Sequence, residues 1–136
     1  MDRRTFLSLA TASAALPAAA LADILDYTPG LVKERLANGE TVFLDFTASW
    51  CSTCRSQGVT IRELKKDNPA YGEAVTFIDV DWDQYGRSEL AMSLRIPRRS
   101  TLVVLKGDAE LGRVVAQTSR SVIKELMDTA LAAATG

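Results

Sequence analysis

The chain has 136 residues with a formal net charge of −1; 47% of them are hydrophobic, two are cysteines and none is histidine. This length fits one compact domain with its own core, and the charge balance argues against a nucleic-acid partner, which requires a basic surface. The missing histidines exclude Cys–His nucleophile pairs and His-bearing zinc sites, and two cysteines are too few for a closed four-thiolate metal site within one chain.

Residues 1–22 have the pattern of a targeting segment that precedes the folded domain. Arg3 and Arg4 supply a positive head, an Ala-rich apolar run follows, and small residues predict cleavage after Ala22. The paired arginines indicate a twin-arginine export signal, with an ordinary secretory signal as the alternative. A membrane anchor is disfavoured because the run is short and contains proline. We therefore expect the mature domain, residues 23–136, in the bacterial periplasm.

The mature domain is predicted to open with a helix that begins near Leu31 and stops at Asn38 and Gly39. Residues 42–46 then form a run of apolar and aromatic residues, interrupted only by Asp45. The run is short and rich in residues that favour strands, so it predicts a buried β-strand.

Cys51 and Cys54 follow this strand with Cys-x-x-Cys spacing, and the residues after them indicate a helix that ends near Asp67. The N-terminal end of a helix carries partial positive charge and free N–H groups, which would stabilise a thiolate at Cys51. Cys54 comes one turn later, close enough to close a small disulfide ring. Such a ring restrains little of the unfolded chain, so a redox couple is favoured over a structural clip.

The remaining sequence predicts an alternation of helices and strands. The expected elements are a loop at 71–73, a strand at 75–80, a polar connection at 81–86, a short helix at 87–94, strands at 101–105 and 111–116, and a final helix capped by Ser119 or Ser121. The first two strands are joined through a helix, which predicts parallel neighbours, whereas the last two should form an antiparallel hairpin.

This order of elements around Trp50-Cys51-x-x-Cys54 resembles the thioredoxin family, and most closely its exported thioredoxin-like reductases. The resemblance extends from about residue 26 to residue 133, and its specific part is 42–55. It implies a three-layer α/β/α sandwich with a central mixed four-stranded sheet. It also implies a thiol–disulfide oxidoreductase that uses no cofactor or metal beyond the redox-active Cys51–Cys54 disulfide.

The resemblance implies a role for each residue of the motif. Cys51 would be the attacking thiol, on the exposed side of the helix start, and Cys54 the more buried resolving thiol. Trp50 would form an aromatic wall beside the reactive sulfur and contact substrate. Asp45 matches a buried acid beneath the cysteines; burial would raise its pKa, so that it could exchange a proton with Cys54. The alternative is an edge strand that exposes this carboxylate.

Two positions depart from the family pattern. Ser100 stands where relatives carry a cis-proline before the third strand, so we expect a trans or strained peptide there, with the Ser100 backbone offered to substrate. Ser100→Pro is expected to keep the fold. Phe77 is taken to stand where relatives often carry a lysine that pairs with the buried acid. The absence of this cation should raise the pKa of Asp45 further. Arg98 and Arg99 would line the rim of the substrate cleft, unless both are solvated loop charges.

The favoured function is reduction of protein disulfides in the periplasm by a monomeric protein. Its partners would be client proteins with disulfides and a membrane or periplasmic electron donor. Two alternatives remain open at this point. One is a disulfide oxidase or isomerase of the same fold; the other is a non-catalytic dimer that binds a metal or iron–sulfur cluster through the thiolates of Cys51 and Cys54.

Overall fold

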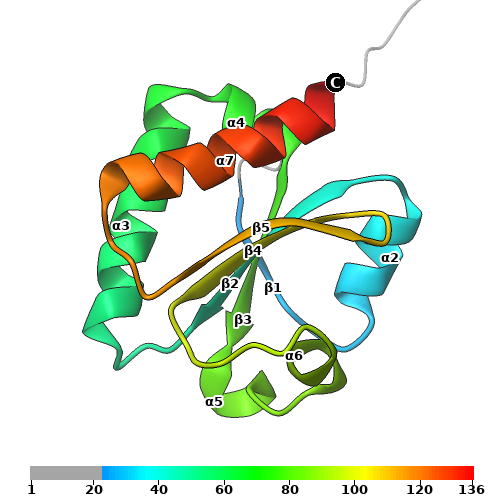
Figure 1. Cartoon of the computed structure of the whole chain (residues 1–136), viewed down its shortest axis with the longest axis vertical. Coiled ribbons are helices and arrows are strands. Elements are labelled where there is room, and N and C mark those ends of the chain that lie inside the picture. The colour runs from blue at the N-terminus through cyan, green and yellow to red at the C-terminus, as the bar shows by residue number, and fades with distance from the viewer. Residues whose placement is uncertain (1–22) are drawn as a thin grey trace, which may run out of the picture.

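The computed structural model describes residues 23–136, so the predicted signal segment, residues 1–22, lies outside the described residues. Elements keep the labels of Figure 1. In chain order they are β1 (Leu25–Asp26), α2 (Leu31–Ala37), β2 (Thr41–Thr47), α3 (Ser52–Asp67), α4 (Ala70–Ala74), β3 (Thr76–Asp81), α5 (Trp82–Tyr85), α6 (Glu89–Ser93), β4 (Thr101–Lys106), β5 (Ala109–Val115) and α7 (Arg120–Thr135).

The strands form one mixed sheet in the order β1-β3-β2-β4-β5. The predicted parallel pairing of β2 with β3 and the antiparallel β4–β5 hairpin are both confirmed. The α/β class is also confirmed, but the sheet has five strands rather than the four expected. The added strand, β1, pairs with β3 through Leu25 and Asp26. Two residues are too few to show an alternating pattern, so its pairing is decided by the neighbouring strand.

The sheet is covered by helices on both faces, which gives three layers (Figure 1). On one face α3, α4 and α7 pack over the odd-numbered residues of β2, such as Phe43; on the other, α2, α5 and α6 pack over its even-numbered residues, such as Leu44. Residues of a strand alternate between faces, so Asp45 lies on the same face as Phe43, beneath α3.

Two short helices, α4 and α5, occupy segments for which no helix was expected. The Asn68 side chain accepts a hydrogen bond from the N–H of Ala70 at the start of α4, and Tyr71 is buried in the core. The Asp81 carboxylate accepts one from the N–H of Asp83 at the start of α5. Helices of four or five residues span little more than one turn, so their sequences carry caps but no repeated amphipathic pattern.

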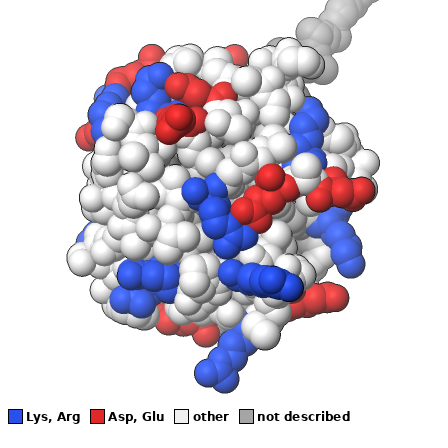
Figure 2. Space-filling model, in the orientation of Figure 1, with Lys and Arg blue, Asp and Glu red and all other residues white. Residues whose placement is uncertain are grey.

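Charged side chains of both signs are interspersed over the face shown in Figure 2, and no continuous basic band crosses it. Within residues 23–136, no helix is long and apolar enough to cross a bilayer.

Candidate active site

The two cysteines lie at the start of α3, where the chain leaves the end of β2. Cys51 is the residue that caps the helix, and its sulfur accepts a hydrogen bond of 3.2 Å from the N–H of Cys54. Both are free thiols. The expectation that Cys51 would be exposed is wrong: its exposed fraction is 4%, against 2% for Cys54. The loop that leads into β4 covers both sulfur atoms, although it is distant from the cysteines in the sequence.

The residue that covers them is Ser100. Its hydroxyl oxygen lies 3.3 Å from the sulfur of Cys51 and 3.0 Å from the sulfur of Cys54. No peptide bond in residues 23–136 is cis, and Ser100 adopts a left-handed backbone conformation with φ of 66°. This conformation is strained for a residue with a Cβ atom and is sustained by the surrounding contacts.

The backbone of Ser100 is already engaged within the protein. Its N–H donates to the carbonyl oxygen of Phe46 at 2.7 Å, and its own carbonyl accepts from the N–H of Ala116 at 2.8 Å. The side chain of Gln57 donates to the same carbonyl at 3.1 Å. In this conformation the Ser100 backbone has no N–H group left over to pair with a substrate, so its predicted role in substrate binding stays a prediction. The hydroxyl group of Ser100 is the part that faces the two sulfur atoms.

Gln57 is a site residue that the sequence reasoning missed. It is fully buried on α3, and its amide nitrogen donates to the carbonyl oxygens of both Ser100 and Gln117. Helical spacing carried the signal, because Gln57 lies on the same stripe of α3 as Cys54 and Ile61. A polar residue on the buried stripe of a helix needs a hydrogen-bond partner, and here that partner is the loop over the cysteines.

These contacts control the ionisation of Cys51. Burial alone would raise the pKa of its thiol, but hydrogen bonds from Cys54, Ser100 and Arg99 outweigh it and lower the pKa from 9.0 to about 6. The helix N-terminus acts in the same direction, because its N–H groups and partial positive charge favour an anion. At neutral pH the Cys51 sulfur is therefore mostly a thiolate.

Trp50 and Arg99 form the outer wall of the site. The Trp50 ring is 56% exposed, and its indole N–H donates to the carboxylate of Asp83 at 3.0 Å. The Arg99 guanidinium lies over this ring, 4.6 Å from its centre. Arg99 therefore has a defined position between an exposed aromatic ring and the reactive sulfur, unlike a fully solvated loop charge.

Asp45 lies beneath the cysteines, as expected, with an exposed fraction of 7%. It lines a cavity of about 150 Å³ together with Cys54, and one of its carboxylate oxygens has no hydrogen-bond partner within residues 23–136. Burial raises its pKa well above 3.8, and the charges of Asp79 and Cys51 act in the same direction, whereas Arg62 opposes them. The Asp45 carboxyl group therefore keeps its proton to a higher pH than an ordinary carboxylic acid does.

The residue opposite Asp45 on β3 was predicted incorrectly. Phe77 pairs with Phe43, and the two rings lie 5.0 Å apart. Asp79 is the register partner of Asp45. The error arose because a shift of two residues along β3 keeps every side chain on its face, so alternation alone cannot fix the register. The position beside Asp45 on β3, where the absence of a lysine was expected, holds a second carboxylic acid, Asp79.

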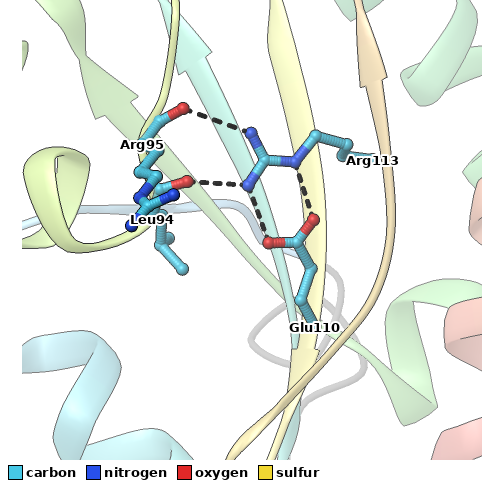
Figure 3. Close-up of polar contacts among 4 residues, drawn as sticks. All are labelled: Leu94, Arg95, Glu110 and Arg113. Atoms are coloured by element: carbon cyan, nitrogen blue, oxygen red, sulfur yellow. Dashed lines mark hydrogen bonds and ion pairs between the residues drawn. The ribbon is translucent and has the colours of Figure 1, made fainter.

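Arg113 of β5 holds the segment that leads to Ser100 (Figure 3). Its guanidinium donates to the carbonyl oxygens of Leu94 at 2.7 Å and Arg95 at 3.4 Å. Two further contacts of 2.7 Å join it to the carboxylate of Glu110. Paired contacts of this kind fix the orientation of a guanidinium, so β5 restrains the loop that places the serine hydroxyl between the sulfur atoms.

This arrangement defines a class of protein. A pair of thiols at a helix N-terminus, one of them ionised at neutral pH, is suited to thiol–disulfide exchange. A family model described as Thioredoxin matches residues 26–129. The chain belongs to the thioredoxin family and is a thiol–disulfide oxidoreductase.

Individual relatives agree with this assignment. A thioredoxin from Echinococcus granulosus is 32% identical over 83 residues, which are 61% of this chain and 71% of that protein. An H-type thioredoxin from Oryza sativa subsp. indica is 30% identical over 99 residues, 70% of this chain and 76% of that protein. The crystal structure of Trxlp from Edwardsiella tarda EIB202 has a TM-score of 0.66 at 24% identity and supports the fold alone; the match covers 76% of this chain and 98% of that one.

Proposed function

We propose that this protein reduces disulfide bonds of client proteins in the bacterial periplasm, with Cys51 as the attacking thiol and Cys54 as the resolving thiol. The observation that carries this proposal is the environment of the Cys51 sulfur, which is hydrogen-bonded by the Cys54 N–H and lies 3.3 Å from the Ser100 hydroxyl. Thiolates attack disulfides, and a pKa of about 6 leaves Cys51 ionised at neutral pH.

The reaction proceeds in two exchanges. The Cys51 thiolate attacks one sulfur of the client disulfide, and the other client sulfur leaves as a thiolate. Cys54 then loses its proton and attacks the Cys51 sulfur of the mixed disulfide, which forms the Cys51–Cys54 bond and releases the second client thiolate. Asp45 lines the cavity beneath Cys54 and is the proposed route for the Cys54 proton.

The outer wall supplies the contact surface for the client. The exposed ring of Trp50 offers an apolar face beside Cys51, and the Arg99 guanidinium that lies over it adds positive charge. Clients with an acidic residue near the disulfide should therefore be favoured. Because both sulfur atoms are nearly fully buried, the client must displace part of this wall, or the loop around Ser100, to reach Cys51.

The direction of electron flow has a second candidate, a disulfide oxidase. The Ser100 hydroxyl bonds a thiolate better than a disulfide sulfur, so it stabilises the reduced pair, and a stabilised reduced form makes a stronger oxidant. Against this, a Cys51 pKa of about 6 is closer to the value near 7 of a thioredoxin than to the value near 3.5 of a strong oxidant. We therefore favour reduction.

Export and the electron donor belong to the same proposal. The Arg3-Arg4 pair and the apolar run after it support passage across the inner membrane. The periplasm is oxidising, so a protein that reduces disulfides there needs an electron donor that regenerates the Cys51–Cys54 dithiol. Replacing both arginines with lysine in the precursor should keep the protein in the cytoplasm; unaltered export would indicate the ordinary secretory route.

The reduction potential decides between the two directions. A value near about −270 mV supports the reductase, whereas a value near about −120 mV supports the oxidase. The protein should also reduce an accessible disulfide, such as those of insulin, when a chemical dithiol regenerates it. Cys51→Ser should abolish this activity, and Cys54→Ser should instead accumulate mixed disulfides that identify the clients. Activity that survives Cys51→Ser would refute the assignment of the attacking thiol.

The metal-binding alternative needs two chains, because within residues 23–136 no three His, Cys, Asp or Glu side chains are arranged so that they could hold a metal ion. Thiolates from two copies of Cys51 and Cys54 could supply four ligands. Metal analysis and the visible absorption spectrum of the purified protein would test this alternative directly.

A further inference from the structure

A row of three carboxylic acids crosses the sheet beneath α3. Asp26 of β1 is the register partner of Asp79 of β3, and Asp79 is the register partner of Asp45 of β2. Residues that pair in register on parallel strands point to the same face, so all three side chains lie on the side covered by α3. From Asp26 to Asp45 the row runs from the edge of the sheet to the space beneath the cysteines.

Asp79 connects two hollows of different character. The inner cavity, of about 150 Å³, is lined by Asp45, Asp79 and Cys54. Its lining mixes apolar side chains with polar ones, and its size gives room for several water molecules. One oxygen of the buried Asp45 carboxyl group has no hydrogen-bond partner among residues 23–136 and is available to bind one of them. A second, more open hollow is lined by Asp79 together with Asp26, Asp81 and Asp83. Asp79 is only half-buried, so its carboxylate has access to solvent that Asp45 lacks.

We propose that Asp79 is the outer proton acceptor of the resolving step and acts on Cys54 through Asp45. The inference rests on the proposed function, since it explains how the Cys54 proton leaves a nearly closed site. Asp79 touches neither sulfur atom; it is a positioning residue that sets the protonation of Asp45 and takes up the proton that Asp45 passes on.

The proton passes from Cys54 to Asp79 in two coupled transfers. Cys54 gives its proton to the protonated Asp45 through the inner cavity, while Asp45 gives its own proton to the Asp79 carboxylate. The result is a Cys54 thiolate, a neutral Asp45 and a neutral Asp79. The thiolate attacks the Cys51 sulfur of the mixed disulfide, and the client sulfur leaves with the electron pair of the broken bond. Asp79 then releases its proton to solvent through the outer hollow.

The surrounding charges favour this order of protonation. The charged and titratable groups that face the pair are Asp26 of β1, Asp81 and Asp83 of the outer hollow, Arg55, Arg62 and Lys65 of α3, both cysteines, and Asp23, whose charge acts on Lys65. Burial, with the charge of Asp26, raises the pKa of Asp79 to about 6, whereas Arg62 and Lys65 lower it. The pKa of the more deeply buried Asp45 is raised well above 3.8. Asp79, which is less buried and lines the outer hollow, is therefore the member of the pair that ionises first as the pH rises.

The test is the pH dependence of the resolving step, measured in single turnovers from a preformed mixed disulfide at Cys51. In the unmodified protein the rate should rise through about pH 6 as Asp79 ionises. Asp79→Asn should remove this rise and slow the step at least about tenfold near pH 7, with little difference from the unmodified protein at low pH. The double variant with Asp45→Asn should be no slower than Asp45→Asn alone, because both changes interrupt one path.

Asp26→Asn is the matched control, since Asp26 belongs to the same row but does not line the inner cavity. It should leave the plateau rate unchanged and move the rise to lower pH, because a like charge beside Asp79 has been removed. Carbon-13 NMR titration of the reduced protein should show a lower Asp45 pKa in Asp79→Asn than in the unmodified protein.

The outcomes separate the inference from the function on which it rests. A protein that reduces no disulfide overturns the proposed function, and the relay with it. A protein that reduces disulfides, but resolves at an unchanged rate in Asp79→Asn, overturns the relay alone. An Asp45 pKa that does not respond to Asp79→Asn also overturns it, without use of any activity measurement.

Discussion

The hydroxyl oxygen of Ser100 lies 3.3 Å from the sulfur of Cys51, although the two residues are 49 positions apart in the chain. The same oxygen lies 3.0 Å from the sulfur of Cys54. A hydroxyl group has one proton to donate, so between two sulfur atoms it donates to one and accepts from the other. With Cys51 ionised, the favourable arrangement is donation to Cys51 and acceptance from the Cys54 thiol.

Ser100→Ala should therefore raise the pKa of Cys51 by about one to two units, since a hydrogen bond to a charged group contributes about 1.5–3 kcal/mol and one pKa unit corresponds to about 1.4 kcal/mol. The thiolate absorbance of the reduced protein, followed against pH, measures this shift. The reduction potential should become more negative, because the reduced form loses a stabilising contact. Ser93→Ala, which removes a hydroxyl that donates to the Leu90 carbonyl oxygen in α6, is the control. An unchanged Cys51 pKa in Ser100→Ala would show that the hydroxyl does not bind the thiolate.

Ser100→Pro should destabilise the protein by about 3 kcal/mol or more, contrary to the expectation from sequence that it would keep the fold. Proline requires a φ near −65° and has no N–H, whereas Ser100 has a φ of 66° and donates to the carbonyl oxygen of Phe46. Ser100→Gly is the matched variant, because glycine accepts this φ and keeps the N–H. Its free energy of unfolding in urea should stay within about 1 kcal/mol of the unmodified protein. Equal stability of the proline variant would mean that the loop can adopt another conformation.

Asp45→Asn should change how stability depends on pH. An unfolded chain loses the Asp45 proton near its ordinary pKa of about 3.9, whereas the folded protein keeps it to much higher pH. The folded state then binds more protons than the unfolded state, so stability falls as the pH rises between the two pKa values. Relative to the unmodified protein, Asp45→Asn should gain stability as the pH rises above about 4. Asp108→Asn, in an exposed turn, should show no such gain; a parallel pH dependence for Asp45→Asn and the unmodified protein would contradict a buried neutral acid.

Arg113→Lys should loosen the loop that leads to Ser100. Lysine cannot form the paired contacts with Glu110 and also reach the carbonyl oxygen of Leu94, so we expect a loss of about 1–2 kcal/mol in the free energy of unfolding. Alkylation of Cys51 should become faster, because the loop over the sulfur opens more often. Glu110→Gln is the comparison, since it leaves the carbonyl contacts of Arg113 in place and should have the smaller effect on both measurements. Equal effects of the two variants would place the restraint in the ion pair alone.

The sequence alone was sufficient for the strand at 42–46, the Cys51–Cys54 pair at a helix start and the parallel crossover to β3. The first two depend on signals within one short segment, an apolar run and cysteine spacing followed by helix-ending residues. The crossover depends on the helical segment that joins two consecutive strands. The export segment at residues 1–22 is likewise a prediction from sequence, and it remains one.

The tertiary structure alone decided which side chains meet at the site. The register between β2 and β3 placed Asp79, rather than Phe77, opposite Asp45. The path of the chain into β4 placed the Ser100 hydroxyl against both sulfur atoms, and Gln57 and Arg113 hold that loop in position. Periodicity assigns a residue to a face, but its position along that face depends on contacts with strands and loops far away in the chain. The ionisation of Cys51 and Asp45 depends on those same contacts, because pKa values respond to burial and to neighbouring charges that a linear pattern does not specify.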